Sequence, residues 1–236
     1  PTVPTSPTDL TPDILSALLG WGSGCASSLR CDPAEGQFGK SHQLFFLTVE
    51  YANNPTQPAP GRFFLKFGRS RKEAYFYQAI APRMTVPPLL RCYYAGYDPE
   101  ADRTCLLLED LTDTHTQTEW PLPPTGHQCE QTVQALARVH AQWWQDPRLE
   151  SEFRVVIPPG RTWRDRRAQA HENLPAFLDL LGDRLSPAQR APYARLLSSP
   201  PAKWEIPPSA PRQTLLHGDF HPWNVFYPRD PAGSLR

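Results

Sequence analysis

The loop at residues 217–224 combines the residue types that phosphoryl transfer requires. Its sequence begins His217-Gly218-Asp219, and Asn224 follows five positions after the aspartate, with short, largely apolar runs at 214–216 and 225–227 on either side. Phosphoryl transfer needs a carboxylate that orients the attacking hydroxyl and an amide oxygen that helps to hold magnesium on the phosphates. Asp219 and Asn224 are candidates for these tasks. The alternative is a surface turn in which both side chains only cap backbone groups.

A single lysine, Lys66, interrupts an apolar run at residues 62–67. Successive strand residues face opposite sides, so Arg62, Phe64 and Lys66 would share one face of a strand. A lysine in this position either serves a ligand or extends its charged end from the strand edge into water. Glu73, in the helical stretch that follows, is its candidate partner; the alternative is a solvated glutamate among basic neighbours.

Five strands and one inserted helix are predicted before residue 112. Thr11, Pro12 and Gly20 are the cap, the first residue and the terminator of a short helix that precedes the strands. The strand candidates are residues 25–30, 42–51, 62–67, 86–97 and 104–111, and the inserted helix spans 71–80. We expect an antiparallel sheet whose first two strands form a hairpin with a long, glycine-containing tip.

A second, mainly helical part is predicted after the proline-rich connection at 120–124. Residues 127–145 predict an amphipathic helix, because spacings of three and four relate Val133, Leu136, Ala137, His140 and Trp144. Two shorter helices are predicted in 171–199, the second beginning near residue 186. The expected fold class is α+β, with lobes at residues 1–112 and 113–236.

The sequence His217-Gly218-Asp219-x-x-x-x-Asn224 resembles the catalytic loop of aminoglycoside and choline kinases, which are relatives of the protein kinases. The resemblance extends in the family's order over essentially the whole chain, through Lys66, Glu73 and an interlobe hinge at 106–111. It implies a bilobal, protein-kinase-like fold with an N-terminal five-stranded sheet and a mainly helical C-terminal lobe. The implied activity is transfer of the ATP γ-phosphoryl group to a hydroxyl of a small molecule.

The resemblance also implies a role for each residue of the loop. Asp219 would be the catalytic residue that orients the substrate hydroxyl and accepts its proton. Asn224 would be a ligand of Mg2+, and His217 would organise the loop. ATP and Mg2+ are therefore the implied cofactors.

The nucleotide would be held by the N-terminal lobe and the hinge. By the resemblance, Lys66 contacts the ATP phosphates and pairs with Glu73, while the backbone from Glu109 to Leu111 binds adenine. The hairpin tip at 35–42 would cover the phosphates with its backbone amides, although a Gly-x-Gly-x-x-Gly pattern is absent there.

The chain departs from the family's pattern after the loop. Related kinases place a magnesium-binding aspartate on the next strand, whereas residues 234–236 resemble only the opening of that strand, and Asp230 lies in a proline-flanked turn. We therefore expect a C-terminal lobe that is incomplete and a chain that is inactive as given, through truncation. The alternative function is a nucleotide-binding pseudokinase or interaction module that lacks the metal-binding aspartate.

Composition restricts the partners. Lys plus Arg and Asp plus Glu balance at 24 each, so no net charge draws the chain to nucleic acid or an anionic membrane. The five cysteines are scattered and contain no C-x-x-C pair, which favours a reducing, cytoplasmic location over a disulfide framework or a zinc site. No apolar run reaches the roughly 20 residues that span a bilayer. By the resemblance to small-molecule kinases, the expected partner is a small hydroxylated molecule.

Overall fold

The computed structural model describes residues 2–34, 42–52, 60–85, 89–119, 122–153, 163–198, 213–230, 233, 235 and 236. The chain forms two compact units, of which the first holds Pro1–Phe153 together with Thr214–Arg236 and the second holds Arg154–Gln213. All residues predicted to carry chemistry belong to the first unit. The predicted lobe boundary between 112 and 113 lies inside this unit and stays a prediction.

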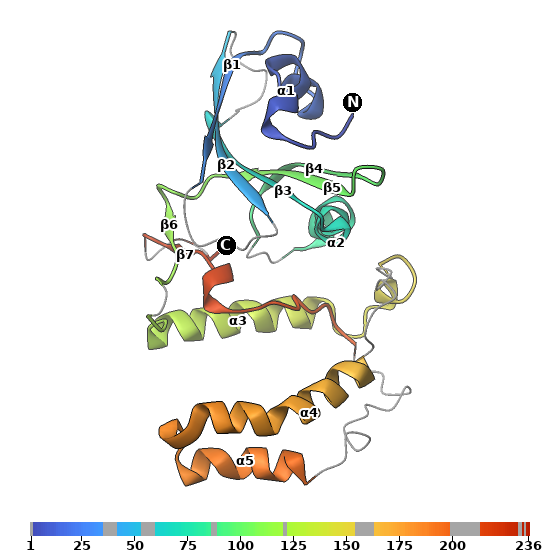
Figure 1. The fold of residues 1–236 in the computed structure, drawn as a ribbon. Helices are drawn as coiled ribbons and strands as arrows, with labels where there is room; N and C mark the ends of the chain where they lie inside the picture. The colour runs from blue at the N-terminus through green and yellow to red at the C-terminus, as the bar shows by residue number, and fades with distance from the viewer. Residues whose placement is uncertain are drawn as a thin grey trace. The chain divides into compact units, whose positions relative to one another are not determined.

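An antiparallel five-stranded sheet is the main element of the first unit (Figure 1). Its strands, in spatial order, are β1 (Ala26–Pro33), β2 (Gln43–Tyr51), β3 (Arg62–Gly68), β5 (Arg103–Glu109) and β4 (Cys92–Asp98). The predicted sheet is confirmed, although β1 continues to Pro33 and β4 begins only at Cys92, against predicted limits of 30 and 86. Most of the β1–β2 tip lies outside the described residues.

The strand β3 has one buried face and one face that carries the lysine, as its alternation predicts. Phe63, Leu65 and Phe67 are at most 2% exposed and belong to the main core, which also contains Leu47 of β2 and Leu107 of β5. Because these residues fix which side of the sheet is buried, they also fix the side on which Lys66 lies.

The helix α1 (Pro12–Leu18) packs beside β1. The Thr11 side chain caps the start of the helix by accepting a hydrogen bond from the Ile14 amide at 3.2 Å. Gly20, just after the helix, has φ of 68°, a conformation that a residue without a Cβ adopts at little cost. Leu15 is fully buried in the main core. The predicted capped helix is confirmed.

The chain after β3 forms α2 (Arg71–Tyr75), a π-helical turn (Phe76–Ile80) and a 3-10 turn (Ala81–Arg83). Ser70 caps α2 by accepting the Glu73 amide at 3.3 Å. The predicted limits of 71 and 80 are right, but the second half is wound more widely than an α-helix.

The helix α3 (Gly126–Gln142) begins with a capping box in which Thr125 and Gln128 bond to each other's backbone amides. It is followed by a 3-10 turn (Pro147–Leu149). A second core cluster of Ile80, Trp143 and Phe153 joins the end of the α2 segment to the end of α3.

The buried face of α3 differs from the predicted one. Val133 is 64% exposed and Trp144 is 52% exposed, whereas Thr132 and Trp143 are buried. Trp143 packs edge-on against the Phe153 ring, with centroids 5.5 Å apart, and this contact buries the first tryptophan of the pair instead of the second. The predicted stripe is therefore wrong by one position at its first and at its last residue.

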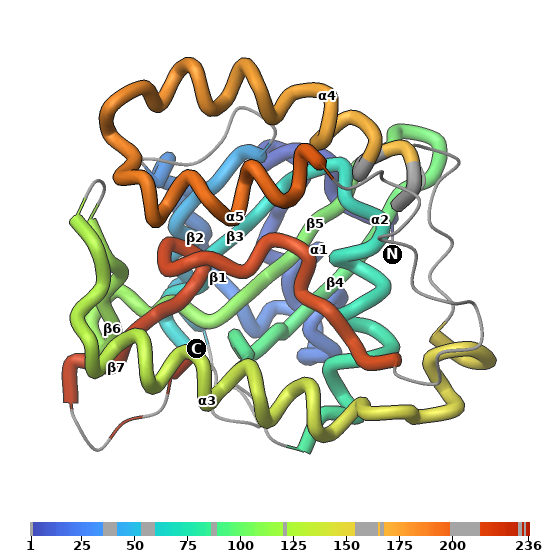
Figure 2. The backbone as a smooth tube through the Cα atoms, turned by 90° about the horizontal axis from the view of Figure 1, so that it is seen from below, coloured from blue at the N-terminus to red at the C-terminus, as the bar shows by residue number. Residues whose placement is uncertain are grey.

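The second unit contains two antiparallel helices, α4 (Trp163–Leu181) and α5 (Pro187–Leu197), which lie side by side in both views (Figures 1 and 2). Ser186 caps α5, as predicted. Phe177 and Tyr193 hold the pair together, with ring centroids 6.1 Å apart. The two predicted helices are confirmed, but the first begins at 163 instead of 171.

Within the parts of the chain that the structure describes, no helix is both long and apolar enough to cross a bilayer. All five cysteines are free thiols. Burial raises the pKa of Cys92 and of Cys105 to about 12, so both thiols remain protonated at neutral pH.

Candidate active site

The strand β3 and the helix α2 bring Lys66 and Glu73 together. Lys66 lies opposite Leu44 of β2 and Leu106 of β5, on the sheet face that the main core does not use. Its Nζ donates to Glu73 Oε1 at 2.7 Å, and the two side chains are 22% and 27% exposed. This geometry contradicts both alternatives, since Lys66 does not extend into water and Glu73 is not a solvated glutamate. The predicted pairing is present, while its role toward ATP stays a prediction.

The sheet face beside Lys66 is apolar. Phe46 of β2 and Phe64 of β3 pack edge-on with ring centroids 5.7 Å apart, and the Arg62 guanidinium lies 5.3 Å from the Phe46 ring. Arg62 also forms an ion pair of 3.0 Å with Asp110, just after β5. The paired ammonium therefore shares its sheet face with two aromatic rings, and such a face suits a ligand with a charged part and a ring.

The segment that leads into the loop with Asp219 is attached to the last turns of α3. Thr214 Oγ1 donates to the His140 carbonyl at 2.8 Å, and Leu215 packs against the second core cluster. Both views show the segment from residue 213 running alongside α3 (Figures 1 and 2). Half-buried His140 thus supports the loop through its backbone carbonyl.

Within the loop, Asp219 and Asn224 are in direct contact. Asn224 Nδ2 donates to the Asp219 carbonyl at 2.8 Å and to its Oδ2 at 3.3 Å. His217 Nδ1 accepts the Asp219 amide at 3.3 Å, and Gly218 between them has φ of 82°, in the left-handed region that favours glycine. The Asp219 side chain is 80% exposed. The loop therefore presents a carboxylate to solvent on a backbone that its own side chains hold.

His221 belongs to the same cluster. Its Nε2 lies 3.1 Å from Asn224 Nδ2 and 3.6 Å from Asp219 Oδ2. The proline that follows opens the 3-10 turn Pro222–Asn224, which returns Asn224 toward Asp219. Residues 221–223 therefore shape the loop.

A two-stranded sheet holds the loop where it ends. It pairs β6 (His115–Thr116) with β7 (Tyr227–Pro228), and Gln117 Nε2 donates to the Trp223 carbonyl at 2.8 Å. The Tyr227 hydroxyl lies 2.9 Å from the buried Thr132 hydroxyl of α3. The neighbours that fix Asn224 therefore come from two distant parts of the sequence, and sequence reasoning missed both Gln117 and Thr132.

The segment after β7 turns back on the loop. Phe226 and Arg236 exchange two backbone hydrogen bonds, of 2.8 and 3.0 Å, which is the pattern of an antiparallel pair. Arg236 thus has the hydrogen bonds of one strand-like pair, while the predicted opening of a strand at 234–236 stays a prediction. Asp230 lies in the turn between them and accepts the Gly233 amide through its backbone.

Glu109 and Leu111, the predicted hinge residues, lie at and just after the end of β5. The Glu109 carboxylate accepts the Arg91 amide at 2.8 Å and pairs with Arg236 Nε at 3.2 Å. Leu111 is buried, and its carbonyl accepts two amides of the following turn. The Glu109 side chain thus ties β5 to neighbouring segments, and adenine binding by this backbone stays a prediction.

The donor set suits the magnesium ion that the fold family implies. Asn224 uses Nδ2 toward Asp219, and no described residue donates to its Oδ1, the atom that would serve as a metal ligand. Magnesium typically keeps several waters and takes only one or two protein ligands beside substrate phosphates. Among the described residues, no three His, Cys, Asp or Glu side chains form a metal-binding group. Asn224 therefore fits as one ligand of an ion held largely by the nucleotide.

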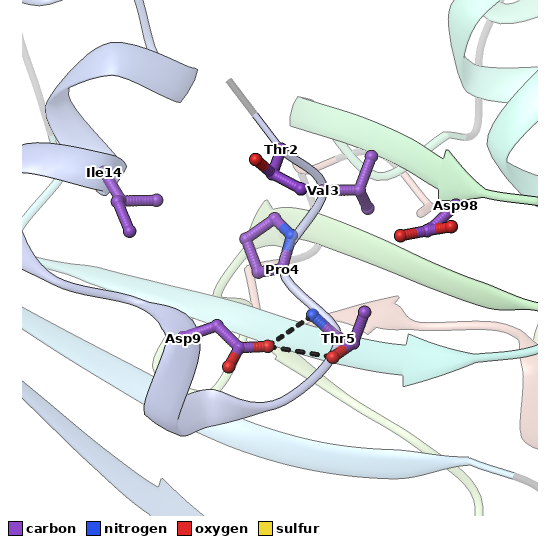
Figure 3. Close-up of a pocket in the computed structure, with 7 residues that line it drawn as sticks. All are labelled: Thr2, Val3, Pro4, Thr5, Asp9, Ile14 and Asp98. Atoms are coloured by element: carbon purple, nitrogen blue, oxygen red, sulfur yellow. Dashed lines mark hydrogen bonds between the residues drawn. The ribbon is translucent and has the colours of Figure 1, made fainter. Parts of the chain in front are cut away.

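A surface hollow elsewhere in the first unit is separate from these residues. It is lined by residues 2–5, Asp9, Ile14 and Asp98 (Figure 3). The Thr5 amide and hydroxyl donate to the Asp9 carboxylate at 2.8 and 2.9 Å, which holds the pKa of that carboxyl below its usual value. These bonds order the N-terminal segment, and none of the predicted site residues lines the hollow.

A paired lysine and glutamate on a kinase-like sheet, with an Asp–Asn loop in the same unit, are the parts of a phosphotransferase. Residues 54–233, more than half of the chain, match the model of the phosphotransferase enzyme family, APH. The chain belongs to this family, its fold is α+β and protein-kinase-like, and the resemblance of the loop motif is confirmed. No curated protein and no solved structure matches the chain significantly.

Proposed function

We propose that this phosphotransferase uses ATP and transfers its γ-phosphoryl group to a hydroxyl of a small molecule. The observation that carries the proposal is the contact between Lys66 and Glu73, at 2.7 Å, in the same unit as the loop in which Asn224 contacts Asp219. Each half alone occurs in many proteins. A kinase needs both, because one holds the phosphates and the other presents the acceptor.

Asp219 would orient the acceptor hydroxyl and take its proton as the new bond forms between the acceptor oxygen and the γ-phosphorus. The bond between that phosphorus and the β,γ-bridging oxygen breaks, and ADP leaves. The exposed carboxylate of Asp219 suits this task because the acceptor can approach it from solvent. The contacts with Asn224 and His217 support it by limiting how the loop backbone moves.

Lys66 would neutralise phosphate charge, and Glu73 would keep the ammonium in place. The aromatic surface of Phe46 and Phe64 on the same sheet face would pack on the base or ribose. Magnesium, when bound, would supply charge neutralisation on the phosphates, with Asn224 Oδ1 as its protein ligand. Most of the catalysis would therefore be positioning and electrostatics.

The acceptor class and the location are also proposals. The resemblance of the loop to that of aminoglycoside and choline kinases supports a small hydroxylated acceptor. Equal numbers of acidic and basic residues give no net attraction to nucleic acid or to an anionic membrane. Five free cysteines support a reducing, cytoplasmic location.

Asp219→Asn tests the function on the full-length protein. A positioned base contributes roughly 100- to 10,000-fold in rate, so turnover should fall by that order while ATP affinity changes little. Asp13→Asn, at an exposed position of α1, is the matched control and should be neutral. Near-normal turnover by Asp219→Asn would refute the assignment.

A panel of aminoglycosides, choline-like amino alcohols, sugars and nucleosides tests the acceptor class, and phosphorylation of proteins alone would contradict it.

The second candidate function is a nucleotide-binding pseudokinase or interaction module. It is favoured by the position of Asp230, the first carboxylate after the loop, which lies in a turn instead of on a strand. Nucleotide-induced thermal stabilisation without magnesium-dependent ATP turnover would support this candidate.

A further inference from the structure

His42 lies next to the predicted phosphate site, on the same face of the sheet as Lys66. The β2–β3 register pairs Gln43 with Phe67 and Leu44 with Lys66, so the next position outward places His42 opposite Gly68. Residues two apart on a strand share a face, which puts His42 and Gly68 on the side of Leu44 and Lys66. His42 is thus a diagonal neighbour of Lys66 across the strand pair.

The missing side chain of Gly68 makes room for the imidazole. A Cβ added at Gly68 would lie 3.3 Å from His42 Nε2 and 2.7 Å from its Cδ2, and the second distance is shorter than Cβ contacts in proteins. The ring therefore packs directly over the end of β3. Gly68 itself is buried, so this position of the ring is built into the sheet.

Burial, one cation and one carboxylate determine the electrostatic surroundings of His42. Burial lowers the pKa of His42, the Lys66 ammonium lowers it further, and the Glu73 carboxylate partly opposes them. The imidazole is therefore neutral in the free protein at neutral pH. A polyphosphate beside Lys66 would reverse the local field, because its negative charges favour the protonated ring.

We propose that His42 is a proton-linked phosphate ligand, which takes up a proton when a nucleoside triphosphate binds beside Lys66. The proposal rests on the proposed function, because it uses the same nucleotide site. Lys66 supplies a permanent positive charge, and His42 supplies a second one only when the anion is present. Binding is then stronger at lower pH, since it consumes a proton.

Calorimetric titration with magnesium and AMP-PNP, a non-hydrolysable ATP analogue, tests the proposal. Repeating it in buffers of different ionisation enthalpy gives the number of protons bound, and adenosine serves as the ligand without phosphates. We expect proton uptake with AMP-PNP, none with adenosine, and an affinity that falls by up to about tenfold per pH unit between about pH 6 and 8.

His42→Gln should bind AMP-PNP with neither the proton uptake nor the added pH dependence, whereas His127→Gln, at an exposed position of α3, should behave as the wild type. Gly68→Ala keeps the histidine but displaces its ring, so it should also reduce the uptake. Lys66-dependent binding with unchanged uptake in His42→Gln or in Gly68→Ala overturns this proposal alone. No AMP-PNP binding by the wild type, or binding that Lys66→Met leaves intact, overturns the proposed function as well.

Discussion

Removing the charges of Lys66 and Glu73, singly and together, measures how strongly the pair is coupled. Lys66→Met and Glu73→Gln keep most of the side-chain length and each remove one charge. Because Nζ and Oε1 are 2.7 Å apart, each single variant leaves one charge without its partner. The double variant should therefore lose less than the sum of the single losses.

The expected coupling follows from the distance and the exposure. Two unit charges at 2.7 Å interact with about 6 kcal/mol at an effective dielectric constant of about 20. Desolvation and the ordering of two long side chains offset most of this, and both groups retain more than a fifth of their exposure. We expect a net coupling of about 1–2 kcal/mol, which corresponds to roughly 5- to 30-fold in catalytic efficiency.

The assay is a double-mutant cycle on kcat/KM for ATP, repeated on the free energy of unfolding from denaturant titration. Arg30 and Asp32 of β1 form the matched control pair, with a similar separation of 2.9 Å but exposures of 74% and 50%. Its coupling should stay below about 0.5 kcal/mol. A Lys66–Glu73 coupling no larger than that of the control would refute the reasoning from distance and burial.

Three further predictions concern stability and reactivity. Tyr227→Phe deprives the buried Thr132 hydroxyl of its partner and should cost about 1–3 kcal/mol in denaturant unfolding, most of which an added Thr132→Val should restore. Gly218→Ala places a Cβ at φ of 82° and should cost about 1–2 kcal/mol in the same assay, together with a lower turnover. Because its pKa is raised to about 12, Cys92 should be alkylated far more slowly at pH 8 than exposed Cys129 in mass-spectrometric labelling, and similar rates would contradict the burial argument.

The helix α1 and the strands of the N-terminal sheet could be predicted because local signals determine them. The cap at Thr11, the terminating Gly20 and the alternation around Lys66 each act over a few residues, and all three are confirmed. The start of β4 was harder to predict, because Leu89 and Leu90 are apolar like strand residues, yet the β4–β5 register begins only at Cys92. Register with a partner decides where a strand begins, and composition does not encode it.

The periodicity of the sequence did not predict which face of α3 is buried. Trp143 and Trp144 are adjacent, so a helical stripe fits either of them almost equally well. The contact with Phe153, which lies beyond the helix, selects Trp143. Periodicity gave the existence of the helix, while a tertiary contact selected its buried face.

The candidate site also contains residues that the sequence predicts and residues that only the fold reveals. Lys66, Glu73, Asp219 and Asn224 could be found from a motif, its spacing and a family resemblance. The groups that hold them could not, because Gln117, Thr132 and Arg236 have ordinary neighbours in sequence and meet their partners only in the fold. His42 has the same character, since only the β2–β3 register brings it beside Lys66.

The anchors of the loop at 217–224 also determine when it can form during folding. The three side-chain contacts that hold its two ends join residues 74, 95 and 106 positions apart in sequence. Closing such long segments costs chain entropy before any contact compensates for it, so these contacts should form late. Strands β2 and β3 and the Lys66–Glu73 pair need only short loops and should be native earlier. A nascent chain would thus have the Lys66–Glu73 pair in order before Asp219 is in place.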